Sequence, residues 1–227
     1  MRIAIYDLDR TLTRSPTFTP FLHFAAARIA PWRLAFSPVW ILLMIGYRLG
    51  LYNRTRLKRM GMKLLLGRPS LAQLEQVGAA FAARRLDNGG LMPGAVELLE
   101  HDRAQGARLV VATAAFEFYA RAFARALDIH DLVATRWDGK DIPGGNCYGE
   151  EKKRRFLEWC AGEGIDPATA TIRFASDSFA DAPLLDMAAE PIFVTANRSE
   201  ARKALARGWI PMDLTAGLAP AASIPQG

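Results

Sequence analysis

The stretch IYDLDRTLT, residues 5–13, places two aspartates one residue apart at the end of a short apolar run. Alternate side chains of an extended backbone point the same way, so the carboxylates of Asp7 and Asp9 face one side together. Within the stretch only Arg10 offsets their charge. Two like charges this close lower stability unless they hold a cation or share a proton. The stretch therefore predicts a strand that ends in a charged site.

Beyond residue 90 the chain alternates apolar runs with amphipathic segments. Strand and helix alternating at this spacing predict an α/β fold, with a Rossmann-like parallel sheet and helices on both faces. The first strand, residues 2–6, belongs to the same sheet. The spacing predicts the other strands at 107–115, 131–136, 171–176 and 191–196, and helices at 92–106, 116–129, 150–164, 181–189 and 199–208.

Residues 16–88 break the alternation, because they contain several helical stretches and no convincing strand. Ser70 and Gln73 have the spacing of a capping box at the start of one of these helices. We therefore expect an all-helical cap lobe at 16–88, inserted after the first strand into a catalytic core made of residues 1–15 and 89–227.

The composition is that of an ordinary folded protein, with 51% hydrophobic and 23% charged residues among 227. Cys147 and Cys160 stand in no CxxC pair and near no histidine cluster, which predicts reduced, structural thiols. The first apolar run is too short for the core of a secretion signal, so a cytoplasmic location is expected. The charge is uneven: residues 10–74 hold eleven Lys or Arg and no Asp or Glu, which leaves −5 for the remainder of a chain of net charge +6.

Three predicted strands end in polar residues, at Asp7, Thr113 and Asp177. Ligands of parallel α/β sheets bind beyond the carboxyl ends of the strands, so these side chains are expected to converge. Lys152 and Asp181 follow at the starts of later helices. Such carboxylates suit Mg²⁺, which prefers hard oxygen ligands, and a carboxylate can also attack phosphorus.

Four motifs resemble, in order and context, those of the haloacid dehalogenase (HAD) superfamily: DLDRTLT (7–13), VVATAA (110–115), GEEKKRRF (149–156) and SDSFADAPLL (176–185). One such motif alone is weak, whereas four in order with the right strand contexts are specific. The sequence is most similar to the phosphoserine-phosphatase-like branch, which carries a helical cap between its first two motifs. The resemblance implies a phosphatase that forms an aspartyl-phosphate.

The resemblance also implies roles for individual residues. Asp7 is the nucleophile, and Asp9 is the general acid that later acts as the base. Thr113 and the backbone of Ala114 hold the phosphate oxygens, and Lys152 neutralises charge between Asp7 and the phosphate. The implied Mg²⁺ ligands are the side chains of Asp7 and Asp177 and the backbone carbonyl of Asp9, while Asp181 orients its neighbours.

The sequence departs from the family pattern at three positions. Arg10 stands where many members have Gly, Ala115 where Ser is frequent, and Ser176 where Gly usually precedes the metal aspartate. No charged catalytic group is lost, so the departures affect the shape of the phosphate pocket.

Three assignments leave alternatives. Thr113 is also a candidate N-cap of the following helix, and helix N-termini attract anions. Asp181, before APLL, fits an N-cap as well as a site residue. Lys152 is preferred to Lys153 because of its spacing from Gly149.

The cap combines apolar and basic character. Residues 34–47 carry no charge, but they are too few for a membrane-spanning helix. In the basic segment 54–68, Leu57 and Leu65 fall on one helical face beside Lys58 and other cations, a composition typical of helices that lie on membranes. The alternative is a closed helical lobe with residues 38–46 inside and a basic rim. The insertion is also loosely similar to that of bacterial phosphatidylglycerophosphate phosphatases.

Three functions remain open. The first is hydrolysis of a membrane-lipid phosphate, which adds an anionic membrane surface as a partner. The second is hydrolysis of a soluble metabolite such as phosphoserine or phosphocholine, and the third is a non-catalytic binding module that uses the basic cap. Nucleic acid is not an expected partner, because the basic residues alternate with aliphatic ones and lack an RNA-binding aromatic motif. The oligomeric state is not specified by the sequence.

Overall fold

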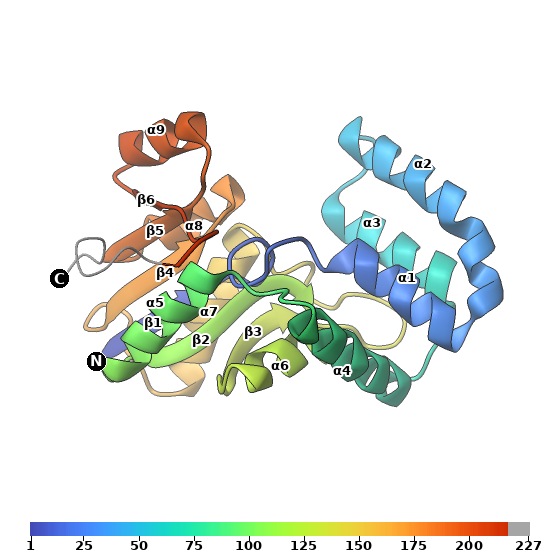
Figure 1. Ribbon diagram of the computed structural model, residues 1–227, viewed down its shortest axis with the longest axis horizontal. Coiled ribbons are helices and arrows are strands. Elements are labelled where there is room, and N and C mark those ends of the chain that lie inside the picture. Colours follow the sequence, from blue (N-terminus) through green and yellow to red (C-terminus); the bar gives the residue numbers. More distant parts are fainter. Residues whose placement is uncertain (218–227) are drawn as a thin grey trace.

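The computed structural model describes residues 1–217 and consists of a sheet domain with a helical lobe beside it (Figure 1). The sheet has six parallel strands in the order β3-β2-β1-β4-β5-β6. The order reverses at β1, where a crevice forms beyond the carboxyl ends of the strands. The strands are β1 (Arg2–Tyr6), β2 (Arg108–Phe116), β3 (Asp131–Thr135), β4 (Thr171–Ser176), β5 (Glu190–Val194) and β6 (Ile210–Met212).

Helices cover both faces of the sheet, as the alternation predicts. Ile3 and Ile5 of β1 belong to the apolar cluster on one face, while Ala4 and Tyr6 belong to the cluster on the other. The first face packs against α7 (Glu150–Gly162), α8 (Ala182–Leu185) and α9 (Arg198–Ala206), and the second against α5 (Pro93–Ala104) and α6 (Glu117–Ala126). The expected Rossmann-like class is therefore confirmed.

The regular elements of the lobe between β1 and α5 are all helices, which confirms an inserted all-helical cap. The capping box of Ser70 and Gln73 forms at the start of its last helix. Its elements are α1 (Phe18–Ile29), the 3₁₀ turn η1 (Pro31–Phe36), α2 (Ser37–Arg48), α3 (Arg54–Gly61), the π-helical turn η2 (Met62–Leu66) and α4 (Leu71–Asp87).

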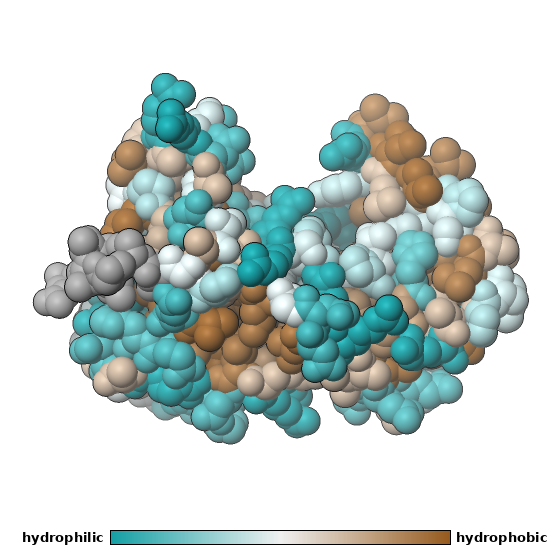
Figure 2. Space-filling model, in the orientation of Figure 1, coloured by the Kyte–Doolittle hydropathy of each residue, from teal (hydrophilic) through white to brown (hydrophobic). Residues whose placement is uncertain are grey.

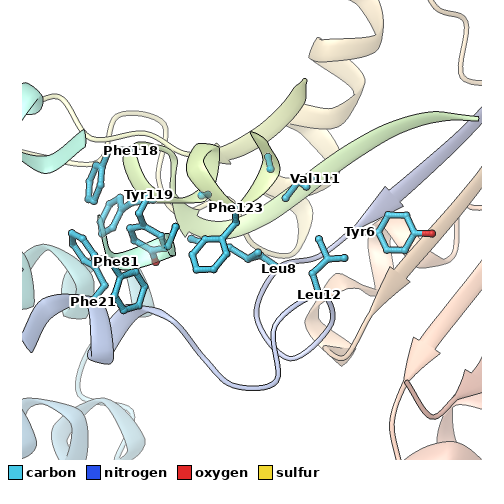
Figure 3. Close-up of a cluster of buried hydrophobic side chains, with 14 of the residues drawn as sticks. Tyr6, Leu8, Leu12, Phe21, Phe81, Val111, Phe118, Tyr119 and Phe123 are labelled. Carbon is cyan, nitrogen blue, oxygen red and sulfur yellow. The ribbon is translucent and has the colours of Figure 1, made fainter. Parts of the chain in front are cut away.

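An aromatic cluster joins the cap to the sheet domain (Figure 3). The ring of Phe21 from α1 stacks on Tyr119 of α6, with the centroids 4.7 Å apart. Phe81 from α4 packs edge-on against both of these rings. Stacked and edge-on aromatic pairs each add about 0.5–1.5 kcal/mol beyond the burial of their area. The cap and the core therefore share one hydrophobic cluster.

The chain enters and leaves the cap at one place. The backbone of Thr13 pairs with Leu91 in an antiparallel bridge. On one side of this bridge the Arg14 N–H donates to the Gly90 carbonyl, and on the other the Met92 N–H donates to the Leu12 carbonyl, each at 2.9 Å. The two connections are thus held side by side, directly after the Asp7–Asp9 stretch.

Three local differences from expectation have physical reasons. Strand β6 is absent from the sequence prediction because it has only three residues and contains Pro211, which is tolerated there because β6 is an edge strand. The helix expected at 181–189 is a 3₁₀ turn, η3 (Phe179–Asp181), followed by the short α8. The basic segment 54–68 breaks into α3 and the π turn η2. Within residues 1–217, no helix combines the length and the apolar character needed to cross a bilayer.

Candidate active site

Asp7 and Lys152 meet at the centre of the crevice. Asp7 follows the last residue of β1, and its N–H donates to the Ala175 carbonyl of the neighbouring strand. Lys152 projects from the first turn of α7, and its Nζ lies 2.9 Å from Asp7 Oδ1. Both side chains are buried. Residues 145 positions apart thus form an ion pair that the fold alone brings together.

Asp181 completes a second contact with the same ammonium. Its Oδ2 accepts a hydrogen bond from Lys152 Nζ at 2.6 Å and another from the Ser176 hydroxyl at 2.6 Å. Its Oδ1 is buried and finds no hydrogen-bond partner among residues 1–217. Asp181 makes no side-chain cap for α8, so its contacts are with the site. Ser176, which replaces the usual Gly, therefore contributes a hydroxyl that orients Asp181.

Burial and charge act in opposite directions on this pair. Burial raises the pKa of Asp7 to about 6, against the lowering effect of Lys152. Burial alone would lower the pKa of Lys152, but Asp181 and Asp7 together raise it well above its usual value. Lys152 is consequently a permanent cation at the base of the site.

Asp9 is fixed by the start of the cap. Its Oδ1 accepts hydrogen bonds from the N–H of Thr17 at 2.9 Å and from the Thr17 hydroxyl at 2.7 Å. The intervening loop folds back on itself, because the Thr13 N–H donates to the Leu8 carbonyl. Arg10 takes a left-handed conformation in this loop, with φ of 59°. Glycine adopts that conformation without cost, which explains why Gly suits this position and why Arg is strained there.

Asp177 lies beyond the end of β4, beside the same crevice. Its N–H donates to the Thr11 hydroxyl oxygen at 3.1 Å, which ties it to the first motif. Burial and the nearby Asp7 carboxylate raise the pKa of Asp177 to about 7, while Arg10 opposes this. A buried carboxylate whose pKa is raised by a second carboxylate nearby is an arrangement that a bound cation would relieve.

The oxygen donors of this set determine which metal it can hold. In the described part of the chain, no three His, Cys, Asp or Glu side chains are arranged to hold an ion by themselves. Mg²⁺ commonly takes only one or two protein carboxylates and completes its shell with water and substrate phosphate. The side chains of Asp7 and Asp177, with the hard oxygen of the Asp9 carbonyl, fit such a partial set.

Thr113 and Ala114 line the same cavity at the end of β2. The Thr113 hydroxyl accepts a hydrogen bond from the Ala115 N–H at 3.0 Å. The expectation that Thr113 also caps the next helix is wrong, because α6 has Phe116 at its N-cap position. Since β2 continues through Ala115 and Phe116, the helix starts too far along the chain for Thr113 to reach its first turn.

The cavity has a volume of about 340 Å³ and brings together all the residues predicted for the site. It also includes Arg54 from the cap and Tyr148 from the segment before α7, with the Arg54 guanidinium 4.6 Å from the Tyr148 ring centroid. Sequence reasoning missed both, because Arg54 is one of eleven cations in its region and carries no distinguishing pattern. The predicted members that line the cavity are Asp7, Asp9, Thr113, Ala114, Lys152, Asp177 and Asp181.

One cap residue lies where the sequence does not predict it. Lys58, expected on the basic face of an amphipathic helix, is buried and points into the core. Its Nζ donates to the Ala114 carbonyl and to Asn146 Oδ1. The sequence pattern fails here because it records that Lys58 is charged but not that α3 turns this side chain toward β2.

Comparisons with known proteins agree with this geometry. A family model for haloacid dehalogenase-like hydrolases matches residues 4–186. The chain is 31% identical over 164 residues to protein CicA of Caulobacter vibrioides, covering 69% of this chain and 71% of that protein.

Two solved structures have the same fold. A protein of unknown function from Bordetella pertussis superposes with a TM-score of 0.82 and 28% identity, covering 94% of this chain and 98% of its own. A phosphoserine phosphohydrolase-like protein from Francisella tularensis gives a TM-score of 0.58 over 93% of this chain and 95% of its own. At 15% identity, the second likeness concerns the fold alone.

Proposed function

Because this chain belongs to the haloacid dehalogenase-like hydrolases, we propose that it is a Mg²⁺-dependent phosphomonoester hydrolase that acts on the phosphate of a membrane lipid, such as phosphatidylglycerophosphate. The observation that carries the chemistry is the buried Lys152, held between Asp7 and Asp181 at 2.9 and 2.6 Å in a polar cavity. A fixed ammonium beside a carboxylate lets the carboxylate approach an anionic phosphoryl group.

The reaction takes two steps. In the first, an Asp7 oxygen attacks phosphorus, the bond between phosphorus and the alcohol oxygen breaks, and Asp9 gives that oxygen its proton. In the second, Asp9 takes a proton from water, the water oxygen attacks phosphorus, and the bond to Asp7 breaks to release inorganic phosphate. Thr17 holds Asp9 Oδ1 through both steps, which fixes the plane of the acid.

The metal and the polar groups have separate tasks. Mg²⁺, held by Asp7, Asp177 and the Asp9 carbonyl, would supply charge neutralisation at the phosphate oxygens. Thr113 and the backbone around Ala114 would bind these oxygens from the opposite side. Lys152 keeps Asp7 ionised at neutral pH and screens its charge from the phosphate.

The choice of a lipid rests on the cap. Helix α2 exposes Ile41, Leu42 and Ile45 by 53%, 66% and 48%, so the alternative in which residues 38–46 pack inside a closed lobe does not hold for them. Figure 2 shows an apolar patch where Figure 1 draws α2, on the rim of the notch between the lobes. We call it the α2 patch; its members are Val39, Ile41, Leu42, Ile45, Leu49 and Leu51.

The α2 patch is close in sequence to a residue of the cavity lining: Arg54, at the start of the next helix α3, lines the cavity. The cavity itself, at about 340 Å³ with mostly charged walls, suits a phosphate and a small headgroup rather than acyl chains. A lipid substrate must therefore leave its chains in the bilayer, and an enzyme that rests on the bilayer meets this requirement.

Charge favours an anionic leaflet. Residues 10–74 contain no Asp or Glu, so the cations around the α2 patch have no acidic neighbours from their own segment. Each Lys or Arg close to an anionic membrane contributes about 1 kcal/mol, and a fully buried Leu or Ile side chain about 1.5–3 kcal/mol. Four cations and three inserted side chains would suffice for reversible binding to the cytoplasmic leaflet.

The nucleophile is tested by Asp7→Asn. The amide is nearly isosteric but not nucleophilic, so turnover of phosphomonoesters should fall below detection, while the protein stays folded because Lys152 keeps Asp181 as a charged partner. Wild-type protein should bind beryllium fluoride, an acyl-phosphate mimic, and the variant should not. Turnover that survives in Asp7→Asn would reject the assignment.

The substrate class is tested by flotation with liposomes and by competing substrates. Wild-type protein should float with anionic vesicles at low salt, detach at high salt, and hydrolyse a lipid phosphate in preference to phosphoserine or phosphocholine. The double variant Leu42→Gln/Ile45→Gln should lose both properties, whereas Leu205→Gln, at a leucine 61% exposed on α9, should keep them.

Other outcomes of these two experiments would support one of the two alternative functions. Absence of flotation together with faster hydrolysis of a soluble phosphomonoester would replace the lipid by a soluble metabolite. Absence of turnover with every phosphomonoester in Mg²⁺, with flotation intact, would leave a binding module that uses the basic cap.

A further inference from the structure

Lys58 is a buried cation without an acidic partner. Its exposed fraction is 3%, and none of the ion pairs among residues 1–217 includes it. Its Nζ donates to the Ala114 carbonyl and, at 2.8 Å, to Asn146 Oδ1. The rings of Phe18 and Phe116 lie 5.4 and 5.1 Å from the ammonium. An isolated buried charge is costly, so neutral acceptors and ring faces must offset its lost hydration.

The partners of Lys58 form one buried network. The Thr135 hydroxyl lies 2.7 Å from the Ala114 carbonyl and 2.9 Å from Asn146 Oδ1, so the same two acceptors face both Lys58 and Thr135. The Asn146 N–H donates to the Thr55 hydroxyl of the cap at 3.3 Å. The end of β2 and the segment before α7 thus bond directly to Lys58, and the end of β3 joins them through the shared acceptors.

The network sits directly behind the cavity. Thr113 and Ala114 line the cavity, and the Ala114 carbonyl that accepts from Lys58 belongs to the same peptide as the Ala115 N–H. That N–H is bonded to the Thr113 hydroxyl. Asn146 is followed, two residues later, by Tyr148, which also lines the cavity. A shift of the Lys58 ammonium would therefore displace cavity walls on two sides.

We propose that Lys58 is a positioning residue: from the cap, it holds the end of β2 in the conformation that binds the substrate's phosphate, so that the phosphate pocket is complete only while α3 is seated on the core. The inference rests on the proposed phosphate chemistry. It assigns to the cap a part in building the pocket, in addition to any part in selecting the alcohol.

The electrostatics give this contact a pH dependence. Burial lowers the pKa of Lys58 to about 7, and Arg54 on its own helix adds to the lowering. Asp9 and Asp7 beyond β1, and Cys147 next to Asn146, act in the opposite direction. Lys58 therefore loses its proton near neutrality in the free protein, whereas an incoming phosphate dianion favours the charged form.

The test compares Lys58→Met with Arg59→Met. Arg59 is the next residue of α3, and its ion pair with Asp141 also links the cap to the core, at 2.9 Å, but at the partly exposed surface. Lys58→Met should weaken binding of inorganic phosphate, measured by calorimetry, by about 10-fold or more, and should lower kcat/KM by roughly 100-fold, the scale of a misplaced catalytic geometry. Arg59→Met should change both by less than about 3-fold.

Two further readouts separate positioning from a structural role. Amide hydrogen exchange of residues 113–117 should accelerate in Lys58→Met and not in Arg59→Met. The pH dependence of kcat/KM reports the ionisation of groups in the free enzyme. The kcat/KM of wild type should therefore fall as pH rises above about 7, and this decrease should be absent in Lys58→Met.

The inference is overturned if both variants bind phosphate as wild type does, or if exchange at 113–117 is unchanged in Lys58→Met. Phosphate binding and hydrogen exchange need no turnover. A wild-type protein that hydrolyses no phosphomonoester would therefore count against the proposed function and still leave the role of Lys58 open to both measurements.

Discussion

Two lysines flank the candidate phosphate pocket, and both are buried, with exposed fractions of 1% for Lys152 and 3% for Lys58. Lys152 lies within 3 Å of two carboxylates, and these raise its pKa well above the usual value. Lys58 has a carbonyl and an amide oxygen as partners, and burial lowers its pKa to about 7. Two equally buried lysines therefore have pKa values shifted in opposite directions, and the direction depends on whether the hydrogen-bond partners are charged.

The difference corresponds to a division of labour between the two domains. The core supplies a cation that stays charged whether or not substrate is present. The cap supplies a cation whose charge depends on pH and on what occupies the cavity. The cavity thus has one fixed positive charge in its lining and one conditional positive charge behind its wall, and only the conditional one comes from the cap.

Removal of the fixed charge should have the largest effect. Lys152→Ala leaves Asp7 and Asp181 close together without their common partner, and loss of one member of a buried charge pair costs about 3–5 kcal/mol. We expect phosphatase activity to fall by a factor on the order of 10³ or more, and the free energy of unfolding, measured in urea, to fall by a few kcal/mol.

The matched control is Lys153→Ala. Lys153 is half-buried and takes part in none of the ion pairs found in residues 1–217, so its removal should change activity less than 2-fold by the ordinary behaviour of surface substitutions. Equal, small effects of the two substitutions would show that the wrong lysine has been assigned to the site.

Removal of the conditional charge should change how stability varies with pH. The pKa of Lys58 is about 7 in the folded protein and about 10.4 in an unfolded chain. Between these values the unfolded state binds more protons, so the contribution of Lys58 to stability increases as pH rises, by at most about 1.4 kcal/mol per pH unit. In urea unfolding at pH 7, 8 and 9, the free energy of unfolding of wild type should increase relative to that of Lys58→Met as the pH rises.

A carboxylate beside Lys58 should narrow this pH window. Asn146→Asp would make Lys58 resemble Lys152 and raise its pKa by about 1–3 units, so the pH dependence of stability should move toward higher pH. Asn88→Asp makes the same chemical change at an exposed position and should leave the dependence as in wild type. If the stability of Asn146→Asp depends on pH as that of wild type does, Lys58 is not the group that titrates.

The smallest effect is expected at the surface. The side chains of Arg59 and Asp141 are 38% and 46% exposed, and exposed ion pairs contribute about 0–1 kcal/mol. Arg59→Met should therefore lower the thermal midpoint by a few degrees at most, measured by calorimetry. A loss as large as that of Lys152→Ala would mean that the surface contacts, and not the buried ones, hold α3 on the core.

The sequence predicted what depends on order and periodicity. The parallel sheet, the helices on both faces and the inserted helical lobe follow from the alternation of apolar runs. The gathering of Asp7, Thr113, Lys152 and Asp177 follows from their places at the ends of strands or the start of a helix. These features are local in the chain, and the rules that join them in space are general.

The sequence did not predict the features that depend on the direction in which an individual side chain points. Nothing in the basic segment 54–68 separates Lys58, which is buried, from Arg56, which is exposed. Arg54 lines the cavity, and the segment carries no signal for this either, because the rotation of α3 relative to the core depends on contacts with residues far away in the sequence, such as Ala114 and Asn146. Composition cannot record such a rotation.

The paired connections of the cap have a consequence for how this protein changes over evolution. The backbone leaves the core at Thr13 and returns beside it at Leu91, so the whole lobe amounts to one long loop closed at its base. A loop closed in this way can lengthen or shorten away from its contacts with the core without shifting a strand of the sheet. The lobe can thus vary while the aspartates beneath it keep their places. An exchange of the lobe must keep the contacts that the site takes from the old lobe: the two Thr17 hydrogen bonds to Asp9, and a side chain that fills the place of Lys58 behind the end of β2.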